Sequence, residues 1–249
     1  MNELSAPPAR LVQDGQWRFG MFNAPIEGLN ALDTSRPFGV PMTRSMKSFR
    51  LKEWQAFQFG NGRHFFNIAL FDAKWLALVQ IKVFDRQTGQ KVVFEKKVLP
   101  SSMQIANGLN RGVSRYDRPG CAMIFDNRWK DGTIQIDMNV APTGSFAGIK
   151  GRLIADCTRT EPLVVSMPFA KNRGMYSQKA MLPLVGELSY GADSIPFESN
   201  TGYLMMDDHK GYYPHTMKWD WLTAAGIVDG RRIGFNLTRN QTIAPELLP

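Results

Sequence analysis

The sequence predicts an all-β protein made of antiparallel strands, and two observations support this prediction. First, segments of alternating apolar and polar residues recur about every ten residues, as in β-barrels and β-sandwiches. Second, Gly, Asp and Asn, which favour turns, separate these segments. Because crossover helices and the loops GxGxxG and GxxxxGK[ST] are missing, a nucleotide-binding α/β fold is excluded. We therefore expect one antiparallel lipocalin-like (calycin) barrel or two packed β-barrel units.

The strand candidates follow one another along the chain. In order, they are 54–59, 65–71, 76–84, 91–98, 122–125, 134–140, 149–155, 163–167, 184–190, 202–206, 217–224 and 231–237. The alternation is clearest after the turn at Asp131 and Gly132, where Ile134 begins a half-buried pattern. Two pairs are expected to form hairpins, because Gly89 and Gly230 can adopt the positive φ that a tight connection needs.

Three segments divide the chain. Residues 1–41 contain five prolines and are expected to lie over the barrel as an extended arm. Residues 42–160 are assigned to a first β unit and residues 161–249 to a second one. If two units are present, the boundary is expected in 158–179, because this stretch contains Pro162, Pro168 and Gly174.

Composition limits the classes of partner. A chain of 249 residues with 43% hydrophobic content can bury one large core or two modest ones. The net charge of +8 comes from scattered Lys and Arg without a basic helix or an RNA-binding signature, so nucleic acid is not an expected partner. The N-terminus lacks an apolar h-region and no later run reaches about eighteen apolar residues, so we expect a cytoplasmic protein without stable membrane insertion.

The stretch 207–221 has the densest group of chemically capable side chains. It holds two of the three histidines, three carboxylates and four large aromatic residues. A histidine beside a carboxylate can exchange protons near neutral pH, so Asp207 and His209 are the first candidates for general acid or base. Tyr213 and His215 are the second donors. In the alternative interpretation, the two aspartates only cap a turn and both histidines are ordinary loop residues.

No metal or cofactor is expected at this stretch. His209 and His215 flank a glycine and a proline, so they are expected around a turn. Zinc sites use tighter spacings such as HExxH, and no cysteine lies nearby. Cys121 and Cys157 form no CxxC motif, which indicates two reduced, buried thiols.

Aromatic and acidic residues provide further candidate ligand contacts. Trp219 and Trp221 point to the same face if they lie in a strand, where they either wall an apolar pocket or fill the core. In the extended segment 50–55, Glu53 and Trp54 point to opposite faces, so Glu53 is expected as a buried acid, as the partner of an arginine, or in a surface ion pair. No GxSxG motif is present, so covalent hydrolysis is not expected.

Several motifs together resemble the uncharacterised family DUF2804. They are the segments 50–54 (RLKEW), 68–72 (IALFD), 175–183 (MYSQKAMLP), 207–221 and 230–237 (GRRIGFNL). The resemblance extends from about residue 38 to residue 246. Lys179, Lys210 and Asn236 lie in these motifs, and we expect them to contact the ligand together with Glu53 and Trp54.

The late motif of this family usually reads Asp-Trp-x-x-Gly, with a basic residue before the glycine. Asp207, Lys210 and Gly211 match it, whereas Asp208 stands where tryptophan is common, so a charge is expected in the pocket wall. Family members continue through further strands after the Gly-Phe-Asn-Leu motif. The chain is therefore expected to be a natural short form or a truncated one, and its open β edge would favour a homodimer.

The family is similar to calycin-like proteins with two lipocalin-type barrels, among them carotenoid hydratases, which implies an apolar pocket. Our first hypothesis is that the chain binds a hydrophobic small molecule, a lipid or terpenoid-like compound, in a β-barrel pocket. The alternative is a cofactor-independent hydratase or isomerase in which Asp207 and His209 transfer protons. A third hypothesis is a structural or interaction protein whose aromatic residues all fill the core, because one fold serves many functions.

Overall fold

The computed structural model of the chain confirms the antiparallel all-β prediction. The structure describes residues 4–240, so residues 1–3 of the expected arm and 241–249 of the expected second unit lie outside the described part. The strands are β1 (Val12–Gln13), β2 (Gln16–Trp17), β3 (Gly20–Phe22), β4 (Lys52–Gly60), β5 (His64–Asp72), β6 (Ala77–Asp85), β7 (Lys91–Val98), β8 (Met103–Gln104), β9 (Gly112–Arg118), β10 (Cys121–Arg128), β11 (Thr133–Val140), β12 (Ile149–Asp156), β13 (Leu163–Ala170), β14 (Arg173–Tyr190), β15 (Asp193–Phe197), β16 (Tyr203–Gly211), β17 (Trp219–Val228) and β18 (Arg231–Asn240).

Both expected hairpin turns are present. The turn between β6 and β7 contains Gly89 at φ 72°, and the turn between β17 and β18 contains Asp229 and Gly230 at φ 49° and 72°. Helices among the described residues are α1 (Arg44–Arg50) and the short 3-10 turns η1 (Ala31–Asp33), η2 (Pro100–Ser102) and η3 (Trp129–Asp131). Thr43 begins α1, because its side chain accepts a hydrogen bond from the Met46 amide at 3.2 Å. None of these helices has the length and apolar character needed to cross a membrane.

One fourteen-stranded sheet forms the body of the described chain. Its strands follow the order β7-β6-β5-β4-β16-β14-β12-β11-β10-β9-β8, with β13 and β15 paired to β14 and β3 paired to β13. β14 connects two layers, since residues 175–183 pair with β16 and residues 184–190 pair with β12. At this crossing Gly186 adopts φ 126°, and a Cβ there would lie 2.3 Å from the Arg152 carbonyl oxygen. A glycine therefore allows β14 to pass from one layer to the other.

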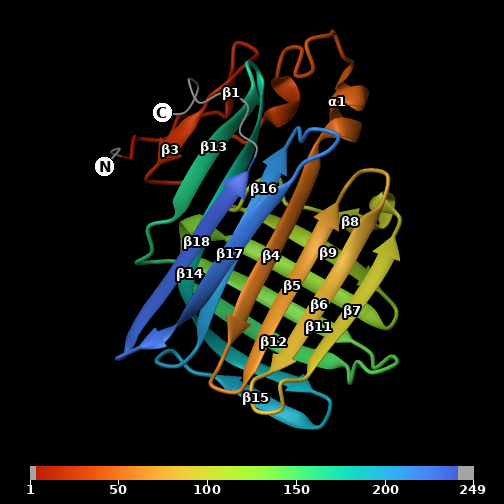
Figure 1. Ribbon diagram of the computed structural model, residues 1–249, viewed down its shortest axis with the longest axis vertical. Helices are drawn as coiled ribbons and strands as arrows, with labels where there is room; N and C mark the ends of the chain where they lie inside the picture. Colours follow the sequence, from red (N-terminus) through yellow and green to blue (C-terminus); the bar gives the residue numbers. More distant parts are fainter. Residues whose placement is uncertain (1–3, 241–249) are drawn as a thin grey trace.

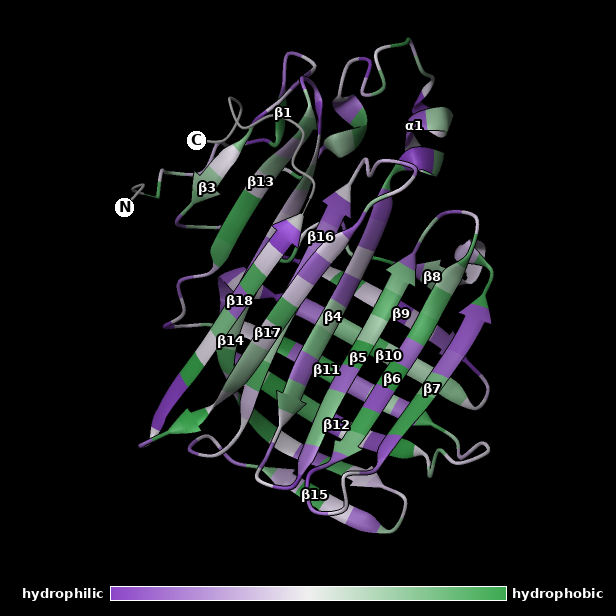
Figure 2. Cartoon of the chain, viewed as in Figure 1, coloured by the Kyte–Doolittle hydropathy of each residue, from purple (hydrophilic) through white to green (hydrophobic). Residues whose placement is uncertain are grey.

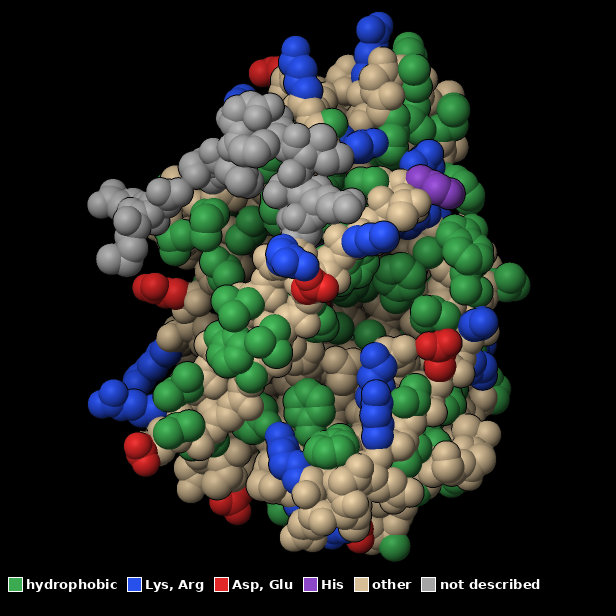
Figure 3. All heavy atoms as spheres, viewed as in Figure 1, with side chains coloured by type: hydrophobic (Ala, Val, Ile, Leu, Met, Phe, Trp, Pro, Cys, Tyr) green, Lys and Arg blue, Asp and Glu red, His purple; other side chains and the backbone are tan. Residues whose placement is uncertain are grey.

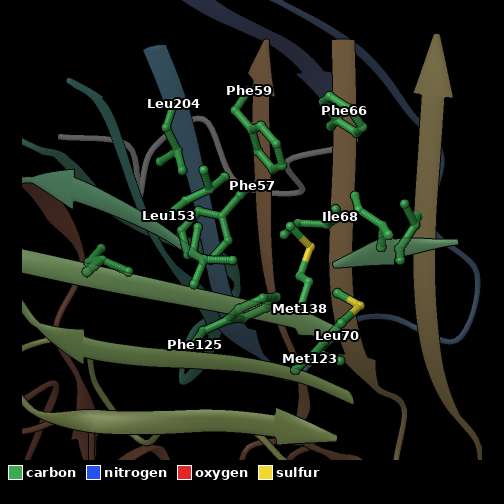
Figure 4. Close-up of a cluster of buried hydrophobic side chains, with 14 of the residues drawn as sticks. Phe57, Phe59, Phe66, Ile68, Leu70, Met123, Phe125, Met138, Leu153 and Leu204 are labelled. Carbon is green, nitrogen blue, oxygen red and sulfur yellow. The ribbon is translucent and has the colours of Figure 1, made fainter. Parts of the chain in front are cut away.

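The sheet curls so that two layers face each other. In Figure 1, β4 to β7 and β16 run along the front, and β9 to β12 cross behind them. The facing side chains form the main hydrophobic core, which includes Phe57, Ile68, Met123, Phe125 and Leu153 (Figure 4). All five are 0% exposed. Burying a side chain of this size contributes about 1.5–3 kcal/mol, so the two layers stabilise each other.

The front layer has a second, outer face. Side chains alternate between the two faces along each strand, and Figure 2 shows the resulting alternation of hydropathy in β5 and β6. In β4, Phe57 and Phe59 point into the core, whereas Trp54 and Ala56 point to the outer face. The outer face therefore has its own set of side chains.

The hairpin of β17 and β18 lies over this outer face, in front of β14 and β16 (Figure 1). The Thr223 hydroxyl donates to the Met205 sulfur of β16. Arg232 Nε donates to the Gly202 carbonyl oxygen at 3.2 Å. These contacts attach the hairpin to the sheet along one side.

The described part of the expected N-terminal arm, residues 4–41, packs against one end of the sheet. Leu11, Trp17 and Phe22 form a second hydrophobic cluster with Tyr176 and Tyr212. The division of the chain near residue 160 stays a prediction, and β12 and β13, on either side of it, both pair with β14. The homodimer through an open edge also stays a prediction; the path of the described sheet ends at β7 and β8.

Candidate functional site

A cavity of about 500 Å³ lies on the outer face of the front layer. Residues of β4, β5, β6, β13, β14 and β16 form its floor, and the β17–β18 hairpin lines one side. Figure 3 shows this face hollowed beside the hairpin, with hydrophobic side chains inside the hollow. The volume is within the range of about 300–1,000 Å³ that small-molecule sites have.

Most of the cavity lining is apolar. Aliphatic, methionine and aromatic side chains from both sides contribute, among them Ala56, Ala69, Phe71, Leu78, Val165 and Met167. They come from alternate positions of neighbouring strands, as the period of two requires. The sheet itself separates this lining from the main core.

One wall of the cavity carries a connected group of five polar side chains. Asp207 forms an ion pair with Lys179 and lies 2.8 Å from His209 Nε2. His209 Nδ1 lies 3.2 Å from the Tyr213 hydroxyl, and Nε2 lies 3.1 Å from Ser177 Oγ. Asp207 and His209 alternate along β16, and their direct partners on β14 are Lys179 and Ser177. Strand pairing therefore brings these four side chains to the same face.

Trp54 fixes the orientation of this polar group. Its indole stacks on the His209 ring, with ring centroids 4.4 Å apart and an interplanar angle of 17°. Its Nε1 donates to Asp207 Oδ2 at 3.4 Å. Tyr213 lies between Trp54 and Phe169, at centroid distances of 5.4 and 5.3 Å. The aromatic rings thus restrict both the imidazole and the phenol.

Burial and charge set the protonation states. Burial would raise the pKa of Asp207, but His209 and Lys179 outweigh it and hold that pKa well below its usual range. Burial lowers the pKa of His209, although Asp207 opposes this effect. Burial, together with the charges of Asp207 and Asp208, raises the pKa of Tyr213 well above its usual range. At neutral pH the group therefore contains a carboxylate, a neutral imidazole and a phenol.

The shortest contact of His209 favours one tautomer. Nε2 lies 2.8 Å from Asp207, which can only accept, and 3.2 Å from Lys179 Nζ, which can only donate, so the closer carboxylate favours a ring proton on Nε2. Nδ1 is then a base that accepts the hydroxyl proton of Tyr213. The three side chains are ordered as proton donor, base and counter-ion, which is an arrangement capable of general acid–base chemistry.

The structure brings most of the predicted site residues together. The cavity is lined by Trp54, Lys179, Asp207, His209, Tyr213, Trp219, Trp221 and Asn236. Trp219 and Trp221 remain 52% and 42% exposed and do not fill the core. The Lys179 ammonium lies 5.7 Å from the Trp221 ring centroid and so connects the polar group to the hairpin. The catalytic and ligand-binding roles of these residues stay predictions.

The alternative interpretation, in which Asp207 and Asp208 cap a turn, is wrong, because residues 207–211 are the end of β16. Both edges of this segment are paired, with β4 on one side and β14 on the other. His215 is exposed in the loop before β17 and does not line the cavity. Glu53 and Lys210 point to the opposite face, where a 2.8 Å ion pair joins them and Lys210 is 1% exposed. Lys74 is a second partner of Glu53.

Asp208 also points away from the cavity, which corrects the expectation of a charged pocket wall. It is 0% exposed and lies between Gln55 and Gln178 of the neighbouring strands. Neither of its oxygens has a hydrogen-bond partner among the described residues. Burial raises the pKa of Asp208 to about 7, although Lys210 opposes the shift. A second proton-binding group therefore lies on the other face of β16.

Five polar residues of the lining were not identified from the sequence, namely Asn67, Gln80, Lys82, Ser177 and Thr238. Each occupies a position of a strand that faces the cavity, and Ser177 precedes the predicted Lys179 by one strand period. The alternation identifies outward positions, but it does not show which of them the distant hairpin encloses.

The fold and the cavity define an antiparallel all-β protein with an apolar pocket of ligand size. The chain belongs to the family described as "Domain of unknown function (DUF2804)", whose model matches residues 2–243. This match confirms the resemblance found in the sequence motifs. No protein with a curated description matches the chain.

Two solved structures are similar to the chain. CghA, solved with Sch210972, has a TM-score of 0.50 at 12% identity, over 76% of this chain and 57% of the CghA chain. Kievitone hydratase from Nectria haematococca has a TM-score of 0.40 at 8% identity, over 77% of this chain and 61% of the hydratase chain. The chain thus spans less than two thirds of the length of both proteins. At this identity the similarity to CghA concerns the fold alone. We draw no conclusion from the weaker similarity to kievitone hydratase.

Proposed function

We propose that the chain binds a largely apolar small molecule in the cavity on the outer face of the sheet. The observation behind this proposal is the cavity itself, about 500 Å³ with a mainly apolar lining and a polar group gathered on one wall. Apolar surface gains about 25 cal/mol per Å² on leaving water, and a few placed polar groups orient the ligand. CghA was solved with Sch210972, but we base the proposal on the cavity and not on that similarity.

A cavity-filling variant tests this proposal. Ala69 lines the floor on β5, so Ala69→Trp is expected to weaken binding of the neutral dye Nile red at least about tenfold, which corresponds to about 1.4 kcal/mol. Ala122→Trp is the matched control, because Ala122 is a half-buried strand alanine on β10 outside the lining. Wild type without saturable binding, or an equal loss in both variants, would refute a ligand site here and favour a structural or interaction role.

The ordered group of Tyr213, His209 and Asp207 favours a second function, cofactor-independent acid–base catalysis of the hydratase or isomerase type. Neutral His209 is positioned to take a proton by way of Tyr213, and Asp207 stabilises the imidazolium that forms. A positioned acid or base typically contributes about 10²–10⁴-fold to a rate. The group lies in the cavity wall, so the bound molecule and the proton donor share one space.

The catalytic proposal needs a substrate, and native mass spectrometry of protein purified from its host can identify a retained molecule. With that molecule, Asp207→Asn and His209→Ala are each expected to lower turnover by about 100-fold or more while binding persists. Turnover that survives both substitutions would rule out this mechanism and leave the binding proposal intact.

A further inference from the structure

The cavity has a second polar region, far from the Asp207 wall. Asn67 of β5 and Lys82 of β6 are direct partners across the two strands, and both line the cavity. Both side chains are half-buried, on the outer face. Paired side chains at such positions lie roughly 4.5–5.5 Å apart at Cβ, so one ligand group can contact both.

Lys82 is a cation without a counter-charge among the described residues. No ion pair or hydrogen bond joins it to any residue in 4–240, and the same holds for the Asn67 amide. On the adjoining strand, Glu95 accepts a hydrogen bond from Gln80 at 2.9 Å instead. Lys179, the other lysine of the lining, is already paired with Asp207. The cavity therefore presents one uncompensated positive charge together with a free amide.

The two polar regions are separated by a mainly apolar floor, in which Gln80 lies between Leu78 and Lys82 on β6. His209 pairs with Trp54, Trp54 with Phe71, and Phe71 with Leu78, so three strand spacings lead from β16 to β6. Lys82 lies a further four residues along β6. With spacings of about 4.8 Å between strands and 3.3 Å along a strand, the separation is roughly 20 Å before curvature. Ala56 and Ala69 lie on the floor between them and leave room for a chain.

We infer that the cavity takes a long amphipathic anion, with its carboxylate at Lys82 and Asn67 and its apolar body on the alanine floor toward His209. This inference rests on the proposed function and adds the class of ligand to it. A carboxylate accepts hydrogen bonds from both an ammonium and an amide, which are the two donors present. The opposite end of such a molecule reaches the acid–base group, where its chain and not its carboxylate meets Tyr213.

The fluorescent polyene parinaric acid and its methyl ester test this inference at pH 8 and low salt. Wild type is expected to bind the acid about tenfold more tightly than the ester, because only the acid carries the charge. Lys82→Met is expected to weaken acid binding about tenfold and to weaken ester binding much less, because the ester carries no charge. Asn67→Asp places a carboxylate beside Lys82, so it is also expected to weaken binding of the acid.

Lys97→Met is the matched control, since Lys97 is an exposed lysine on β7, opposite Leu78, outside the lining. If Lys97→Met weakens acid binding as much as Lys82→Met does, the acid is attracted by the general charge of the surface and not by a specific subsite. That result would overturn the inference. Equal binding of acid and ester by wild type would also overturn it, while the proposed apolar site would stand. If neither probe nor Nile red binds, the proposed function itself fails.

Discussion

Replacing Asp208 with asparagine is expected to stabilise the protein at pH 8. Asp208 is 0% exposed and neither oxygen has a hydrogen-bond partner among the described residues, so a charge there is uncompensated. Gln178, its direct partner on β14, has an unpaired side-chain amide nitrogen as well. Asparagine is neutral and nearly isosteric, and its carbonyl oxygen is able to accept from that amide.

The size of the effect follows from the pKa of Asp208, which burial raises from 3.8 to about 7. A difference of roughly three pKa units corresponds to about 4 kcal/mol as an upper bound. Because the folded-state pKa lies above the unfolded-state value, folding takes up a proton between about pH 4 and pH 7. Wild type therefore loses stability as the pH rises through that window, and Asp208→Asn does not. We expect the variant to be about 2–4 kcal/mol more stable at pH 8 and nearly equal to wild type at pH 4.

Urea unfolding, followed by tryptophan fluorescence at both pH values, measures this difference. With an m value of about 3 kcal/mol/M, a gain of about 3 kcal/mol moves the midpoint by about 1 M. Asp207→Asn is the control at the neighbouring position, and it is expected to destabilise by about 3–5 kcal/mol because it breaks a buried ion pair. A variant Asp208→Asn that is less stable than wild type at pH 8, or whose gain does not depend on pH, would refute the reasoning.

Three further outcomes are expected. Glu53→Gln removes the 2.8 Å carboxylate partner of buried Lys210 and should lower the free energy of unfolding by about 3 kcal/mol, measured by the same titration. Nitrogen NMR of the three histidines should show His209 neutral at pH 7 with its proton on Nε2, and a proton on Nδ1 would contradict the proposed order of the group. Gly186→Ala should lower stability by about 1–3 kcal/mol in thermal unfolding, since φ there is 126°; an unchanged melting temperature would argue against the strained crossing.

Local signals in the sequence predict many of the strands, but not β9, β15 or residues 173–183 of β14, and they do not predict the order in which the strands pair. The alternation beginning at Ile134 and the turn glycines Gly89 and Gly230 act within a few residues, and all three lie in the structure as expected. The position of β16 between β4 and β14 joins segments far apart in the chain, and no spacing encodes it. This placement is what selects the residues that share the cavity.

The candidate site, too, was predictable where local chemistry decides and not where long-range strand pairing decides. Asp207 and His209 were predicted from their chemistry and do lie together, with Trp54 and Lys179 beside them. The alternative of a turn at Asp207 and Asp208 depends on the preference of Asp and Gly for turns, but strand pairing on both sides overrides that preference. His215 belongs to the same segment, but it is exposed and lies beyond the end of β16. Composition alone therefore does not distinguish His215 from His209.

Four consecutive residues of β16 point alternately to the two faces of the sheet. Asp207 and His209 belong to the cavity, while Asp208 and Lys210 belong to the buried opposite face. Inserting or deleting one residue upstream in this strand would exchange the two sets, placing an unpaired acid and a lysine in the cavity and the imidazole in the interior. Insertions and deletions should therefore be absent from β16 among diverging family members and tolerated in the loop 212–218. Substitutions, in contrast, can change either face of the strand separately. The strand thus allows the cavity wall and the buried interior to evolve independently, provided that its register is kept.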